Sequence, residues 1–125
     1  MNNKKLGTEF ENELCKILKE QGFWVHFMSP DARGAQPFDI IAVKDNIPIA
    51  IDCKTCVANT FNISRLEDNQ KFAFRRWLDC DNEHAVIAVK HDGKIYFIDY
   101  EFLIECNGKV RFEDCCRMGE WMRGI

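Results

Sequence analysis

The stretch that decides the fold is Pro37–Lys54, which reads PFDIIAVKDNIPIAIDCK. It contains two apolar runs, Phe38–Val43 and Ile47–Ile51, separated by the polar segment Lys44–Asn46. Short runs that are rich in Ile and Val and bounded by turn residues are typical of β-strands. The stretch therefore predicts a β-hairpin.

Charged residues lie at the ends of both predicted strands. Asp39 is near the start of the first strand, and Asp52 and Lys54 are at the end of the second. Because side chains alternate along a strand, Asp52 and Lys54 share one face and Cys53 points to the other. Two carboxylates can hold a divalent cation beside the lysine ammonium, an arrangement suited to phosphodiester hydrolysis.

Each of these charged residues also has an ordinary structural explanation. Asp39 alone could end a turn, and Asp52 with Lys54 could form a surface ion pair of little energetic value. Their combination, with Asp52 directly after the apolar run, favours a functional site.

These residues resemble the signature of a known superfamily. PFD followed by DCK at strand spacing is similar to the PD-(D/E)XK nuclease signature, and GTEFENEL upstream resembles the Glu-bearing first helix of Holliday-junction resolvases. The segments TCVANTF and SRLEDNQ resemble the stretch that follows the active site in RecU-type resolvases. The resemblance covers roughly Gly7–Tyr100. It implies an α/β fold with a restriction-endonuclease-like (PD-(D/E)XK) core, a mixed central β-sheet flanked by helices.

The resemblance also implies roles for individual residues. Lys54 would orient or deprotonate the attacking water or stabilise developing charge, and Gln70 would steady that water or a phosphate oxygen. Resolvases often carry Glu where this chain has Asp52, which changes ligand reach. The protein ligands of Mg²⁺, with Mn²⁺ as an alternative, would be Glu11, Asp39, Asp52 and the backbone carbonyl of Cys53.

A first helix is predicted over Leu6–Gln21, with Gly22 as its stop. Thr8 followed by Glu11 has the spacing of a capping box, so Thr8 is predicted to cap this helix. Its apolar stripe is formed by Phe10, Leu14, Ile17 and Leu18.

Two glutamates flank this apolar stripe, Glu11 and Glu13. Both could be solvated or capping residues. The resemblance to resolvases selects Glu11 as the carboxylate that joins the metal site, with Glu13 as the second choice.

A second helix is predicted over Ser64–Asp79, with a capping box formed by Ser64 and Glu67. Gln70 is a polar residue on the face that should pack on the sheet, so it needs a hydrogen-bonding partner. It could be a satisfied core amide or a member of the site. The packing face comprises Leu66, Gln70, Ala73, Phe74 and Trp77.

Basic residues of the second helix are candidates for DNA binding. Lys71, Arg75 and Arg76 form the best basic patch in the chain and could contact phosphates, although a solvated surface is an equal alternative. Arg33, in the predicted loop Ser29–Gln36, is a further candidate.

The remaining segments complete the predicted order of elements. Phe23–Met28 is predicted as an edge strand, and Ala85–Lys90 and Lys94–Ile98 as a hairpin. Tyr100–Glu105 is predicted as a short helix. Val110–Ile125 could pack back on the domain or join a dimer interface, and both alternatives stay open.

The composition bounds the class of protein. A chain of 125 residues with ordinary apolar and charged fractions predicts one domain, residues 1–125. No run of about 18 apolar residues occurs, so no membrane span is expected. Seven cysteines, an odd number, indicate reduced thiols and an intracellular protein. The resemblance to resolvases implies the cytoplasm of a bacterial, archaeal or phage-infected cell. Cys53 and Cys56 lack a second CxxC pair, which disfavours zinc.

Together these observations predict a Mg²⁺-dependent DNA endonuclease. The net charge of −3 argues against a protein that coats DNA by bulk charge. The resemblance implies a Holliday junction resolvase that cleaves branched DNA in recombination and repair as a homodimer. The alternatives are another PD-(D/E)XK nuclease of restriction or repair type, or an inactive DNA-binding protein with the same fold.

Overall fold

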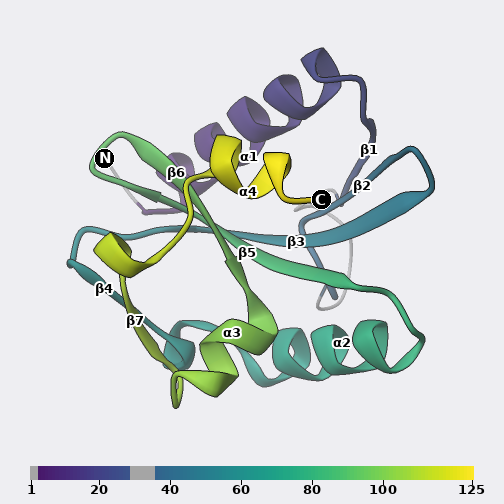
Figure 1. Ribbon diagram of the computed structural model, residues 1–125. Coiled ribbons are helices and arrows are strands. Elements are labelled where there is room, and N and C mark those ends of the chain that lie inside the picture. Colours follow the sequence, from purple (N-terminus) through teal and green to yellow (C-terminus); the bar gives the residue numbers. More distant parts are fainter. Residues whose placement is uncertain (1–2, 29–35) are drawn as a thin grey trace.

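A five-stranded mixed sheet with helices on both faces forms the body of the computed structural model, which describes residues 3–28 and 36–125 (Figure 1). The strand order is β1-β2-β3-β5-β6, and β4 and β7 form a separate two-stranded sheet. The elements are α1 (Asn3–Glu20), β1 (Trp24–Phe27), β2 (Ile40–Lys44), β3 (Ile47–Thr55), β4 (Thr60–Asn62), α2 (Asp68–Asp79), β5 (His84–His91), β6 (Lys94–Asp99), α3 (Tyr100–Glu105), β7 (Lys109–Arg111) and α4 (Met118–Arg123).

The predicted hairpin is confirmed as β2 and β3, which pair in register from Lys44↔Ile47 to Ile40↔Ile51. Its turn consists of Asp45 and Asn46, whose φ angles of 52° and 66° lie in the left-handed region. Two such residues form the tight turn that matches strand twist, and Asx residues tolerate this conformation well. The turn therefore fixes the register that sets Asp39 beside the far end of β3.

The long strand β3 occupies the middle of the sheet. It pairs antiparallel with β2 and parallel with β5, from Ile49↔His84 to Thr55↔Lys90. The crossover between these parallel strands carries β4 and α2. The C-terminal half of β3 is therefore enclosed by a neighbouring strand and by the helix of the crossover.

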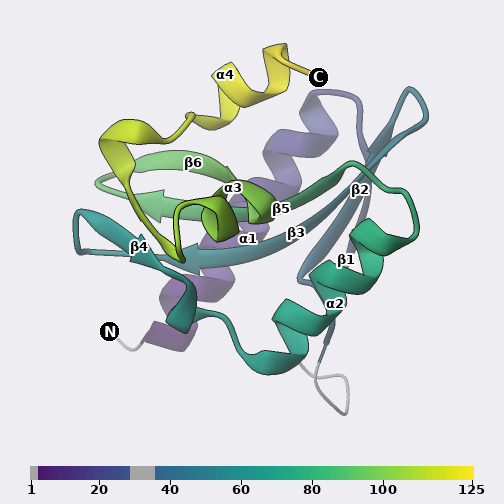
Figure 2. The same cartoon turned by 60° about the horizontal axis from the view of Figure 1, so that its bottom comes forward.

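Helices cover the two faces of the sheet in separate layers (Figure 1). α1 and α4 lie on one side, and α2 and α3 lie on the other, which Figure 2 brings forward. Along β3, Ile49, Ile51 and Cys53 join the core on the α1 side, whereas Ala50 joins the core on the α2 side. The predicted alternation of the strand is confirmed, and Asp52 faces α2.

The first helix begins earlier than the sequence predicts. It starts at Asn3, so Thr8 lies in its second turn and the predicted capping role of Thr8 is wrong. Good helix formers precede Gly7, and nothing in that segment stops the helix from starting upstream. The helix ends at Glu20, and Gly22 follows with φ +93°, which confirms the predicted stop.

The second helix begins later than predicted. Ser64 lies in a 3₁₀ turn, Ile63–Arg65, and its backbone N–H donates to Asn62 Oδ1 at 2.9 Å. Leu66 then adopts an extended conformation with its side chain buried, so the α-helix starts at Asp68 and the predicted cap at Ser64 is wrong. The observed N-cap is Glu67, whose N–H donates to Gln70 Oε1 at 2.9 Å.

The C-terminal segment packs back on the domain. β7 pairs with β4 from Thr60↔Arg111 to Asn62↔Lys109, two segments in which the sequence predicts no strand. Met118 and Trp121 of α4 join the core on the α1 side. The indole N–H of Trp121 donates to Asp99 Oδ1 at 3.0 Å, which ties α4 to the end of β6. The first of the two alternatives for this segment is therefore correct.

Two further features bear on the sequence predictions. None of the helices in the described ranges is long and apolar enough to cross a membrane. All seven cysteines are free thiols, and Cys53 and Cys56 belong to the cores on opposite faces of the sheet. The CxxC spacing therefore does not bring two thiols together as a chelating pair.

The turn after α3 provides a test of how the small sheet is held. Gly108 has φ +84°, and a Cβ at this position would lie 2.7 Å from Ile63 Cγ2. We predict that Gly108→Ala lowers the free energy of unfolding by about 3 kcal/mol, because backbone strain and overpacking add. Urea denaturation measures this change.

Gly93→Ala is the matched control. Gly93 also has a positive φ, +72°, but a Cβ there would meet no atom within 4 Å. Its substitution should cost about 1 kcal/mol, the backbone strain alone. Equal losses for the two variants would contradict the predicted contact with Ile63.

Candidate active site

The site is built on Asp52, in the middle of the sheet on the face covered by α2. Its side chain is fully buried. Oδ1 accepts a hydrogen bond from Gln70 Nε2 at 2.8 Å, and Lys54 Nζ lies 3.2 Å from Oδ2. Lys54 Nζ also donates to Gln70 Oε1 at 3.4 Å. Three polar groups from β3 and α2 therefore form one network in a largely apolar layer.

Asp39, the residue directly before β2, lies beside the same end of β3. Its N–H donates to Ile51 O at 3.0 Å, and its Oδ2 accepts from the Cys53 N–H at 2.7 Å. The N–H and C=O of one strand residue point to the same side, so the Cys53 carbonyl points past Ile40, where β2 begins. The Asp39 carboxylate and this carbonyl thus face one space at the end of β2.

Glu11 joins this group electrostatically from α1. The pKa of Glu11 is raised to about 7, chiefly by burial and also by the Asp39 carboxylate, whereas Lys54 opposes the shift. The pKa of Asp52 is likewise raised to about 7, first by burial and then by repulsion from Asp39, against an opposing effect of Lys54. Three carboxyl groups from separate segments therefore repel one another in one site. A bound cation would relieve this repulsion.

The structure separates the two glutamates of the first helix. Glu13 Oε1 pairs with Lys90 Nζ at 2.5 Å, on the side of α1 that faces the turn between β5 and β6. Glu11 instead interacts with Asp39 and Lys54. Of the two choices left by the sequence, Glu11 is the one near the candidate site.

The residues present fit a hard divalent cation. Asp52 Oδ2 is buried, and among the described residues it faces the Lys54 ammonium at 3.2 Å without a geometrically formed hydrogen bond, which leaves this oxygen under-satisfied. The donors are carboxylate and carbonyl oxygens, the ligands that Mg²⁺ prefers. Within the described residues no three His, Cys, Asp or Glu side chains form a ready metal cage. An ion that keeps several water ligands, as Mg²⁺ does, suits this open arrangement.

Gln70 has two functions at once. Its Oε1 accepts from the Glu67 N–H at the start of α2, and its Nε2 donates to Asp52. The sequence left open whether Gln70 is a core amide or a site residue, and the structure brings it into direct contact with Asp52 and Lys54. The helix start therefore determines the orientation of the Asp52 carboxylate.

The three basic residues of the predicted patch on α2 each have a different neighbour. Lys71 Nζ lies 3.3 Å from Asp68 Oδ1, and the Arg75 guanidinium lies 6.0 Å from the ring centre of Tyr100. Arg76 is exposed and lines a groove with Phe72. The fourth basic candidate, Arg33, lies outside the described residues.

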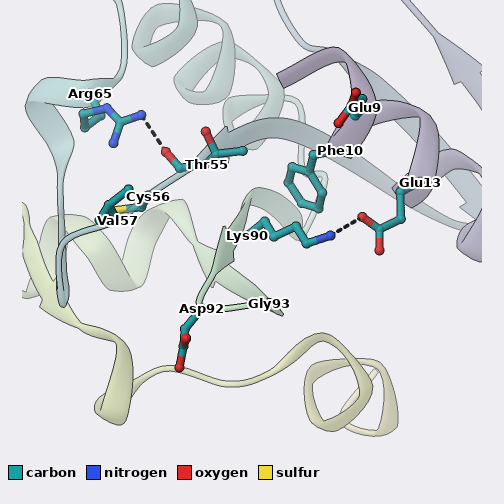
Figure 3. A pocket seen from close by; sticks show the side chains of 10 residues that line it. All are labelled: Glu9, Phe10, Glu13, Thr55, Cys56, Val57, Arg65, Lys90, Asp92 and Gly93. Carbon is teal, nitrogen blue, oxygen red and sulfur yellow. Dashed lines mark hydrogen bonds and ion pairs between the residues drawn. The ribbon is translucent and has the colours of Figure 1, made fainter. Parts of the chain in front are cut away.

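A cavity of about 640 Å³ opens just beyond the end of β3 (Figure 3). Thr55, directly after Lys54, lines it together with Glu13 and Lys90, whose ion pair is drawn as a dashed line in Figure 3. Arg65 donates to Thr55 O at 2.9 Å. No local pattern in the sequence singles out Lys90 or Arg65. Lys90 lies beside Thr55 through the parallel pairing of β3 with β5, and Arg65 reaches Thr55 from the 3₁₀ turn of the crossover.

The sheet order, the helix layers and the cluster at the end of β3 define an α/β nuclease-like fold of the PD-(D/E)XK group. Residues 2–115 match the family described as archaeal Holliday junction resolvase (Hjc). This chain belongs to that family, and the predicted resemblance is confirmed.

Two relatives agree with this assignment. The crossover junction endodeoxyribonuclease Hjc of Methanocaldococcus jannaschii is 28% identical over 103 residues, which cover 82% of this chain and 71% of that protein. The solved structure of Archaeoglobus fulgidus Hjc, a Holliday junction resolvase, superposes with a TM-score of 0.64. That match is 21% identical and covers 84% of this chain and 86% of that one, and it confirms the predicted fold.

A metal titration tests the role of Asp52. At pH 8, above its raised pKa, the buried carboxylate is ionised and destabilises the metal-free fold, because an acid whose folded pKa is raised loses stability as pH rises. We predict that Asp52→Asn stabilises the metal-free protein by about 2 kcal/mol. Magnesium should raise the melting temperature of the wild type but not of this variant.

Glu13→Gln is the matched control, since it removes a carboxylate of α1 that is paired with Lys90 outside the cluster. It should keep the magnesium-dependent rise. Thermal denaturation with magnesium and with EDTA measures this rise in melting temperature. An equal rise in Asp52→Asn and in the wild type would contradict a cation site at Asp52.

Proposed function

We propose that this chain is a Mg²⁺-dependent endodeoxyribonuclease, a single nuclease domain that resolves four-way DNA junctions as a homodimer. The observation that carries the proposal is the buried Asp52 carboxylate, whose Oδ2 forms no geometrically complete hydrogen bond in the described structure, lies 3.2 Å from the Lys54 ammonium and interacts electrostatically with Asp39. Membership of the resolvase family supports the choice of substrate. The free thiols are consistent with action on intracellular DNA.

The proposed metal ligands come from three elements. Asp39, Asp52 and the Cys53 carbonyl face the end of β2, and Glu11 approaches from α1. When bound there, Mg²⁺ supplies neutralisation of phosphate charge and acidification of a coordinated water. The chain's own contribution is to hold these oxygens close together, at the electrostatic cost seen in the raised pKa values of Glu11 and Asp52.

Lys54 is proposed to position the attacking water and to stabilise charge on the phosphate. Its side chain is 18% exposed, so its ammonium can reach solvent and substrate while it is held by Asp52 and Gln70. A lysine ammonium is a compact charge with three donors, which allows one contact to the substrate in addition to two within the protein.

DNA binding is proposed to rest on phosphate contacts that carry no sequence information. Lys71, Arg75 and Arg76 lie on α2, whose first turn carries Gln70, and Lys90 lies in the cavity beyond Lys54. Contacts of this kind fix the position of the DNA and weaken with salt. A dimer would bring two such sites to the two strands that must be cut for symmetric resolution.

Cleavage of a labelled four-way junction and of a matched linear duplex tests the proposal. We predict paired nicks in the junction only, with magnesium and not with EDTA. Asp52→Asn and Lys54→Ala should each lower the cleavage rate by about 10³-fold, because each removes transition-state stabilisation. Lys94→Ala, an exposed lysine of β6, should leave the rate unchanged.

A further variant separates the two functions of Gln70. Gln70→Glu keeps an acceptor for the Glu67 N–H but replaces the donor to Asp52 by a carboxylate, so cleavage should fall and the metal-free protein should melt at a lower temperature, because two carboxylates then face each other. Cutting of both DNA substrates would indicate a general nuclease on this fold. Binding without cutting, with either magnesium or manganese, would contradict an enzymatic function.

A further inference from the structure

Strand β1 carries two exposed aromatic rings at the edge of the sheet. Trp24 is 61% exposed, and the neighbouring ring of His26, also exposed, lies parallel to it with centroids 6.1 Å apart and 11° between the planes. Trp24 is not a scattered apolar residue, because its ring stacks with that of His26 while most of its own surface stays exposed.

The two rings lie on the same face of the sheet as the candidate site. Trp24 pairs with Val43 and His26 pairs with Ile41, and directly opposed residues share a face. Ile41 packs against the core on the α2 side, the side of Asp52.

The strand also sets the distance between the rings and the site. The Met28 N–H donates to Asp39 O at 2.8 Å, so the end of β1 lies level with Asp39. Trp24 is four residues away along the strand, which corresponds to about 13 Å at 3.3 Å per residue. That length equals about four nucleotide steps of B-DNA along its axis.

A flat aromatic surface at this position suits a nucleobase that has lost its stacking neighbour. Bases inside a continuous duplex are covered on both faces, whereas the last base pair of each arm exposes one face where a junction opens. Aromatic side chains stack on such faces without regard to sequence. Building on the proposed nuclease function, we propose that Trp24, supported by His26, stacks on an exposed base at the branch point.

Binding in the non-cleaving Asp52→Asn background tests this inference. The junction should quench the emission of Trp24, and a linear duplex of the same sequence should not. The other two tryptophans are less exposed, and their indole N–H groups donate to His84 O and Asp99 Oδ1. Trp24→Ala should weaken junction binding about tenfold and leave duplex binding unchanged, because one stacked base is lost.

Two variants serve as controls. Trp24→Phe should restore most of the junction affinity, because a phenyl ring also stacks. Phe102→Ala removes an exposed aromatic residue of α3 and should have no effect on either substrate. Circular dichroism and sedimentation should show that all variants keep the fold and oligomeric state of the parent.

Three results would overturn the inference. These are unchanged junction binding in Trp24→Ala, equal losses for junction and duplex, or a change of oligomeric state, which would assign the rings to a protein interface. If the wild type still cuts junctions in any of these cases, the nuclease function stands. If the Asp52→Asn protein binds no junction and the wild type cuts none, both proposals fail.

Discussion

Burial of the Asp52 carboxylate is the constraint on which the rest of the structure depends. An ionised carboxylate in an apolar layer is costly unless charged and hydrogen-bonding groups surround it. Here Gln70 donates to one oxygen at 2.8 Å and Lys54 lies 3.2 Å from the other. The second oxygen accepts no hydrogen bond from the described residues. The protein thus keeps an acidic group where folding alone would favour an apolar one, which is typical of a functional site.

Each neighbouring element can be understood by what it brings to this carboxylate. The tight turn at Asp45 and Asn46 sets the hairpin register, which leaves Asp39 beside Cys53. The start of α2 orients Gln70, and the 3₁₀ turn before it is held by the Ile63 N–H, which donates to Gly108 O at 2.8 Å. The small sheet and the C-terminal segment therefore support the site indirectly.

The sequence predicts those parts of this arrangement that depend on the spacing of residues within one strand or helix. The hairpin, the common face of Asp52 and Lys54, and the packing face of α2 follow from alternation and helical spacing. Capping spacings at Thr8 and Ser64 misled because such pairs also occur inside helices and turns. The pairing of β4 with β7 depends on contacts between distant segments, which no local pattern records. Helical spacing alone likewise left Glu11 and Glu13 equivalent, and only the resemblance to resolvases favoured Glu11.

The central claim is that Asp39 and Asp52 hold the catalytic cation. Anomalous diffraction from crystals soaked in Mn²⁺ tests it most directly, because the ion can be located independently of activity. We predict a single peak at the end of β2, within about 2.2 Å of carboxylate oxygens of Asp39 and Asp52, and its absence in Asp52→Asn crystals. A peak elsewhere, or one that persists in the variant, would contradict the claim.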